Sequence, residues 1–199
     1  MRLDTDWSSA KSRLDFAAEN PLFGGKKHKP VEGDFEDYDP SFLFNRKLPN
    51  ELFLWGADYY AEKLPDRNNG SWLIWDKRLD DSADKMYGSA FETCWSLSKH
   101  KRDFIRVKWA GIFGTEQEPD HKRLHPTQKP VAVYEWILSR YSKTGDISAD
   151  YYLGAGSHLL ACENLNRRCR AIEIDPGYVA VALQRFYDHS GKTPELVKE

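Results

Sequence analysis

A glycine-rich turn and one acidic residue are the first features of this 199-residue chain whose types and spacing could do chemistry. The turn, 154–156 (GAG), lies between a strand candidate at 147–150 and a helix candidate at 159–165. In such a turn backbone N–H groups reach the carboxyl edge of a sheet, and glycine lets a ligand approach them closely. Glu173 lies near the end of the next strand candidate, at 169–174, where its carboxylate can accept hydrogen bonds from ribose hydroxyls. Together the two features predict a nucleoside site.

The spacing within this turn separates two classes of ligand. A dinucleotide-binding turn carries a third glycine, which allows close packing of helix on strand. Leu159 stands at that position, so a pyrophosphate ligand, and with it a dinucleotide-dependent oxidoreductase, is disfavoured. A single nucleoside such as S-adenosylmethionine is favoured. On these residues alone, an ordinary tight turn with a solvated Glu173 stays open as an alternative.

Composition and charge narrow the function classes. Lys and Arg total 29 against 31 Asp and Glu, a net charge of -2, so binding to nucleic acid must come from local patches. No apolar run approaches the roughly 20 residues that span a bilayer, and the amino terminus lacks the apolar core of a signal peptide. We therefore expect a cytoplasmic protein without a membrane segment. The three cysteines show no CxxC spacing, so we expect reduced thiols and no metal site.

The elements that must position the turn are clearest in the last third of the chain. Apolar residues recur at helical spacing from Val131 to Tyr141, after a proline suited to a first helical turn, and we expect Gly145 to end this helix. Strand 147–150, the glycine turn, helix 159–165, strand 169–174 and helix 176–187 follow. This order predicts an α/β fold with a parallel sheet.

Four further strands are expected upstream. Residues 52–55 and 72–75 are apolar, with a helix candidate at 57–64 between them. Residues 91–97 and 104–110 flank the basic run Lys99-His100-Lys101-Arg102, which suggests a hairpin that projects from the main sheet. The seven tryptophans predict a substantial core or an aromatic-lined cleft.

The block from 125 to 186 closely resembles the carboxyl half of the DNA amino-methyltransferases, which act on N6 of adenine or N4 of cytosine. The similarity lies in HPTQKP at 125–130, in the cofactor loop DYYLGAGS at 150–157 and in the strand-to-helix turn IEIDPGY at 172–178. It covers nearly a third of the chain. The resemblance implies a Rossmann-like, S-adenosylmethionine-dependent methyltransferase fold, with a mostly parallel sheet and helices on both faces.

The resemblance also implies a catalytic tetrapeptide of the type [DNS]-P-P-[YFW]. Asn20-Pro21-Leu22-Phe23 matches it upstream of the cofactor loop, which fits the circularly permuted class. Acceptors at the Asn20 side chain and the Pro21 carbonyl would localise the lone pair of the target amine, and Phe23 would stack on a base extruded from the duplex. Asparagine rather than serine at the first position favours adenine.

Three regions follow from the same resemblance: a catalytic half at 1–78, a small target-recognition insertion at 79–124 and a cofactor-binding half at 125–199. The basic run lies in the insertion, so we expect phosphate contacts there. The residues expected to bind DNA are Lys99, Lys101 and Arg102. Those expected around S-adenosyl-L-methionine are Asp150, Tyr152, Gly154, Gly156, Ser157, Glu173, Thr127 and Lys129.

Some residues depart from the family pattern. Leu22 replaces the second proline of the tetrapeptide, Tyr151 replaces a proline in the cofactor loop and Ala155 replaces a serine. The resemblance implies a methyltransferase of the restriction-modification type, of bacterial or phage origin, that acts on double-stranded DNA. A homodimer stays open. The departures leave open a second function: a methyltransferase-like protein with weak or no activity that binds DNA or another protein.

Overall fold

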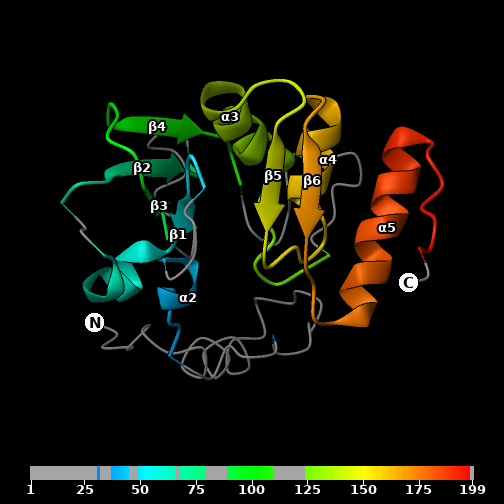
Figure 1. The fold of residues 1–199 in the computed structure, drawn as a ribbon, viewed down its shortest axis with the longest axis horizontal. Coiled ribbons are helices and arrows are strands. Elements are labelled where there is room, and N and C mark those ends of the chain that lie inside the picture. Colours follow the sequence, from blue (N-terminus) through cyan, green and yellow to red (C-terminus); the bar gives the residue numbers. More distant parts are fainter. Residues whose placement is uncertain are drawn as a thin grey trace.

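Four strands form a mixed sheet in the first part of the chain (Figure 1). The computed structural model describes residues 31, 37–44, 49–65, 68–78, 89–109 and 124–197. The strands lie in the order β1-β3-β2-β4. Their bounds are β1 Phe53–Trp55, β2 Ser71–Asp76, β3 Phe91–Ser96 and β4 Asp103–Arg106.

The predicted hairpin of 91–97 and 104–110 is wrong. β3 pairs antiparallel with β1 and β2, whereas β4 pairs in parallel with β2, so β2 separates the two strands. Leu73 and Trp75 of β2 are fully buried, and flanking strands on both sides satisfy the backbone of this central strand. Residues 97–102 therefore carry the chain past the end of β2, and β3 and β4 belong to the sheet.

A second, parallel sheet holds the glycine turn. β5 (Ile147–Asp150) has its predicted bounds and pairs in parallel with β6 (Arg168–Ala171), with α4 (Ser157–Asn164) between them in the chain. Figure 1 shows both arrows pointing the same way. β6 ends at Ala171 rather than at the predicted Ile174, because the chain there turns toward the next helix and leaves Ile172 and Ile174 exposed.

The helices agree with the expected pattern and extend it. The helix at Val131–Tyr141 (α3) lies where the helical spacing predicted it, but it ends before the predicted stop at Gly145, because the backbone is already extended at Ser142. The last helix, α5 (Pro176–Ser190), begins with Pro176 after Asp175, whose side chain accepts a hydrogen bond from the Gly177 N–H. It ends at Gly191, which has φ 70. The two other helical segments are α2 Ser41–Phe44 and the 3₁₀ helix η2 Ala57–Lys63.

Helix α3 joins the hydrophobic cores of the two sheets. Val133 and Ile137 pack with Trp75 and Ile105 of the first sheet. Its other face, with Val131 and Leu138, packs against α4. Because one helix contributes to both clusters, the two sheets share a continuous apolar interior. Three tryptophans of the described residues are buried, which confirms their expected place in the core: Trp75, Trp95 and Trp109.

Candidate functional site

The turn between β5 and α4 requires its two glycines. Gly154 has φ 55 and Gly156 has φ 85, both in the left-handed region that side chains disfavour. A Cβ atom on Gly156 would also lie 2.9 Å from the Cβ of Ala182 on α5. The turn can therefore lie against α5 only if position 156 has no side chain.

The predicted ribose-binding carboxylate, Glu173, lies against this turn. Glu173 Oε2 accepts a hydrogen bond from the Gly154 N–H at 2.7 Å, and Oε1 accepts one from the Asp175 N–H at 2.9 Å. Asp150, at the end of β5, accepts one from the Tyr152 N–H at 2.9 Å. The fold thus brings Asp150, Gly154 and Glu173 together at the carboxyl ends of β5 and β6. Since a carboxylate oxygen accepts more than one hydrogen bond, Glu173 keeps capacity for hydroxyl groups of a ligand.

The HPTQKP segment covers the same turn through its histidine. A Cβ atom on Gly154 would lie 3.4 Å from the His125 ring, and that ring packs edge-on against Tyr178 with centroids 4.2 Å apart. The Thr127 N–H donates a hydrogen bond to His125 Nδ1 at 3.2 Å. His125 is buried and has a structural role, whereas Thr127 is exposed beside it.

Lys129 reaches the first sheet rather than the glycine turn. Its Nζ lies 3.2 Å from Glu92 Oε2 and 5.4 Å from the ring centroid of Trp55. Burial acts to raise the pKa of Glu92, but the ammonium groups of Lys129 and Lys77 outweigh burial and lower it. Lys129 therefore fastens the HPTQKP segment to β1 and β3.

A buried arginine that the sequence did not single out braces the turn. Arg185 of α5 donates from Nη1 to the Ala155 carbonyl at 2.6 Å, and the same nitrogen lies 3.4 Å from Ser157 Oγ. Ser157 is itself buried, so its hydroxyl faces α5. A basic residue on the apolar stripe of an expected helix is the one signal that could have found Arg185.

Aromatic side chains surround the outer side of the turn. The Tyr151 ring contacts Phe42 at 5.8 Å between centroids, and the Tyr152 ring contacts Tyr38 at 5.9 Å. Burial, and then its hydrogen bond with Tyr152, raise the pKa of Tyr38. Tyr152 nevertheless remains 63% exposed. Tyr151, which replaces the proline of the family pattern, thus has a packing partner in α2.

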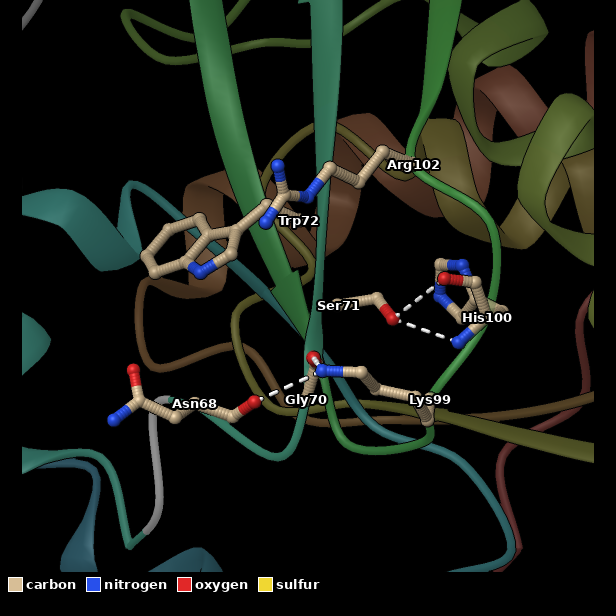
Figure 2. A pocket seen from close by; sticks show the side chains of 7 residues that line it. All are labelled: Asn68, Gly70, Ser71, Trp72, Lys99, His100 and Arg102. Carbon is tan, nitrogen blue, oxygen red and sulfur yellow. Dashed lines mark hydrogen bonds between the residues drawn. The ribbon is translucent and has the colours of Figure 1, made fainter.

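Two of the three expected DNA-binding residues lie beside the start of β2 in the first sheet. Lys99 and Arg102 line a cavity of about 170 Å³ at the start of β2, together with Asn68, Gly70, Ser71, Trp72 and His100 (Figure 2). Lys99 Nζ donates to the Asn68 carbonyl at 2.9 Å. The far end of β2 pairs with Glu92, the partner of Lys129. The cavity and the HPTQKP segment therefore lie at opposite ends of β2.

Four further predicted site residues are not found at the glycine turn or at the cavity in the described part of the chain. Lys101 is exposed and does not line the cavity. The predicted catalytic residues Asn20, Pro21 and Phe23 lie outside the described residues, so their roles stay predictions from sequence.

The β5-α4-β6 unit is parallel and contains the glycine turn, and Glu173 follows the end of its second strand. These features define a nucleoside-binding α/β protein. The DNA methylase family model, which covers the N6- and N4-methyltransferases, matches residues 26–184. The chain therefore belongs to this family, and the resemblance found in the sequence is confirmed.

Curated relatives match parts of the chain. The type II methyltransferase M.HpaI of Haemophilus parainfluenzae is 38% identical over 66 residues, which are 33% of this chain and 21% of the relative. The type II methyltransferase M2.DpnII of Streptococcus pneumoniae is 28% identical over 116 residues, 57% of this chain and 41% of the relative. The chain thus spans less than half the length of these two relatives.

Solved structures share the fold. The PvuII DNA methyltransferase, which is cytosine-N4-specific, aligns with a TM-score of 0.54 at 16% identity, covering 74% of this chain and 68% of that one. A putative DNA modification methylase of Thermus thermophilus, TTHA0409, solved with S-adenosyl-L-methionine, aligns with a TM-score of 0.51 at 16% identity, covering 76% and 74%. The predicted Rossmann-like methyltransferase fold is confirmed. Among the described helices, none has the length and apolar character needed to cross a membrane.

Proposed function

We propose that this chain transfers a methyl group from S-adenosyl-L-methionine to an exocyclic amino group of a DNA base. The observation that carries the proposal is the Glu173 carboxylate on the Gly154 N–H, at 2.7 Å, within the part of the chain that the DNA methylase family model matches. There a carboxylate, a glycine-lined backbone and exposed aromatic rings lie within one short stretch of the fold. This combination suits a nucleoside with a hydroxylated ribose.

Each group at this edge has a distinct part in holding the cofactor. Glu173 accepts hydrogen bonds from the ribose hydroxyls. Gly154 and Gly156 leave room for the methionine portion of the cofactor beside Asp150. Tyr152 offers an exposed ring to the adenine. Thr127 closes the pocket from the HPTQKP side, and Lys129 acts by holding that segment on the sheet through Glu92.

The chemical step needs a positioned amine rather than a strong base. The lone pair of an exocyclic amine is delocalised into the base ring, so acceptors on its N–H bonds favour the tetrahedral geometry that attacks the sulfonium methyl group. Asn20 and Pro21 supply these acceptors, and Phe23 stacks on the extruded base. The asparagine favours N6 of adenine over N4 of cytosine. Within residues 79–124, the parts outside β3 and β4 serve in target recognition on double-stranded DNA. We place this activity in the cytoplasm.

Departures from the family pattern favour a second candidate, a protein that binds the cofactor and DNA yet methylates weakly or not at all. Ala155 replaces a serine of the cofactor loop and so lacks a hydroxyl that would bond the cofactor. Leu22, at a position where proline would stiffen the catalytic loop, points the same way. Such a protein would bind S-adenosyl-L-methionine without turnover.

Labelled methyl transfer to mixed-sequence duplex DNA separates the two candidates. The first predicts label on adenine N6, identified after digestion to nucleosides, and the second predicts cofactor binding without label. Label on cytosine N4 would keep the enzyme and overturn the adenine assignment.

Substitution of Asn20 tests the catalytic loop. We expect Asn20→Ala to lower the methylation rate at least about 100-fold, because loss of one positioned polar group at the reacting atom has effects of that size. Cofactor affinity should stay within about twofold. Asn20→Asp is the matched control, since it keeps an acceptor oxygen and the family pattern, and it should retain most activity. Full activity in Asn20→Ala would show that the catalytic loop lies elsewhere.

A further inference from the structure

We propose that His158, Cys162, Cys169 and Asp150 form a binding site for a thiophilic divalent cation such as Zn²⁺, on the inner side of the glycine turn. One ligand atom from each of the histidine and the two cysteines lies within 4.8 Å of the others. This cluster is separate from the groups that hold the proposed cofactor, apart from Asp150, and it is built from three elements.

The fold explains how these side chains meet. His158 and Cys162 are four residues apart on α4, so they project from one face of the helix, the face that packs on β5 and β6. Cys169 lies in β6, and Asp150 is the last residue of β5. Because α4 packs against β6, the four side chains meet under the helix.

The distances are near those of a tetrahedral site. His158 Nδ1 lies 3.5 Å from Asp150 Oδ2 and 3.8 Å from Cys169 Sγ. Zinc bonds of roughly 2.0–2.3 Å in tetrahedral arrangement separate neighbouring ligand atoms by about 3.3–3.8 Å. Cys162 Sγ lies 3.5 Å from the other ring nitrogen, Nε2, so its side chain needs the largest adjustment.

The second nitrogen of the imidazole has an outer partner. Ser148 Oγ lies 2.8 Å from His158 Nε2. A metal-bound histidine regularly donates its free N–H to such a partner, which fixes the ring orientation. With Nδ1 as the ligand, the Ser148 hydroxyl oxygen would accept a hydrogen bond from the His158 Nε2–H.

Burial favours a structural role for the ion. His158 is 5% exposed and Cys162 is 1% exposed, so the ion would be shielded from water. Four protein donors leave no open position for a substrate, as in structural zinc sites. Two sulfurs and an imidazole suit zinc or cobalt rather than magnesium or calcium.

The site would reach the cofactor edge through Asp150. One oxygen of this carboxylate holds the Tyr152 N–H at 2.9 Å, and the other lies on the cluster side at 3.5 Å from His158. The ion would therefore fix the end of β5 from which the glycine turn starts. The prediction of no metal site rested on local cysteine spacing, which this cluster does not use.

Cobalt titration of the full chain, purified without metal, tests this site directly. We expect one equivalent of Co²⁺ to produce tetrahedral d–d bands and a sulfur-to-cobalt charge-transfer band, and one equivalent of Zn²⁺ to displace them. Cys162→Ser and Cys169→Ser should each weaken the charge-transfer band and lower affinity at least about tenfold. Cys94→Ser is the matched control, because Cys94 is a buried thiol of the first sheet and should leave the spectrum unchanged.

Other results would overturn the site. A spectrum without sulfur charge transfer, or one unchanged in both cysteine variants, would show that the metal binds elsewhere or not at all. If the variants fail to fold, the wild-type chain decides: Zn²⁺ should raise its melting temperature in a one-to-one titration, and an unchanged melting temperature contradicts the proposal. None of these readouts requires methyl transfer, so their failure is distinct from that of the proposed function.

Discussion

Two edges of the molecule carry polar side chains, and they differ in what those side chains contact. At the carboxyl ends of β5 and β6, Glu173 binds backbone N–H groups of a turn with two left-handed glycines. At the start of β2, Lys99 and Arg102 line a cavity whose lysine donates to nearby carbonyls. The first edge presents unusual backbone geometry together with a carboxylate, whereas the second presents a cluster of positive charge.

The comparison shows that a basic run in a sequence does not reveal which edge of a sheet it occupies. In open α/β sheets, ligands bind at the carboxyl ends of strands. Lys99 and Arg102 lie at the amino end of β2, so we expect them to contribute less to DNA binding than groups near the glycine turn. Substitutions at the two edges should therefore differ in their effects on stability and on ligand binding.

Gly156→Ala should have the largest effect. The left-handed φ of 85 and the 2.9 Å approach to Ala182 should together reduce the free energy of unfolding by about 2–4 kcal/mol, and cofactor binding should be lost. Gly145→Ala is the control, because Gly145 also has φ 85 but nothing lies within 4 Å of its Cβ position. Denaturant unfolding of both variants measures the difference, and equal losses would show that contact with α5 does not matter.

Glu173→Gln should come next. Because hydrogen bonds to a charged acceptor contribute about 1.5–3 kcal/mol, we expect affinity for S-adenosyl-L-methionine to fall about 10- to 100-fold in calorimetric titration. Glu163→Gln, on α4 away from the turn, should leave the affinity unchanged. A wild-type chain that shows no heat of binding would remove the cofactor site and the enzyme proposal together.

Lys129→Ala should have a smaller, pH-dependent effect on stability. The folded state lowers the pKa of Glu92 below its ordinary 4.5, so the ion pair stabilises the fold above that pH and is lost as the pH falls through the lowered value. We expect a loss of about 0.5–1 kcal/mol at pH 7 that shrinks below pH ~4. Lys192→Ala, at the more exposed pair with Glu163, should change stability less. A loss independent of pH would point to lost contact with Trp55 instead.

The double substitution of Lys99 and Arg102 by alanine should have the smallest effect. Two full phosphate contacts would flatten the slope of log affinity for DNA against log salt by about 1.8; at this edge we expect a smaller change in slope, with affinity falling only a few-fold at moderate salt. An unchanged slope would place the cavity outside the path of the DNA. A loss of more than about tenfold would reverse the ranking of the two edges.

Local pattern was enough to predict the elements in the last third of the chain. The bounds of β5 and the apolar face of α3 were predicted correctly, and the glycine turn came from a residue type that alone tolerates its backbone geometry. The HPTQKP segment carried the family assignment, which the match over residues 26–184 confirms. Such features depend on neighbours within a few positions of the chain, so they can be deduced before any tertiary contact is known.

Contacts between segments that are distant in the sequence could be known only from the tertiary structure. The order of β3, β2 and β4 depends on which strands bury Leu73 and Trp75, and no local pattern distinguishes a hairpin from a crossover over one strand. The bracing of the turn by Arg185 and the meeting of His158 with Cys169 likewise join residues of different elements. The sequence by itself determined which residues could bind a nucleoside. Only the packing of helices on sheets decided which side chains, such as Arg185 and His158, lie behind those residues. The physical reason is that a hydrogen bond or an ion pair needs two partners that are close in space.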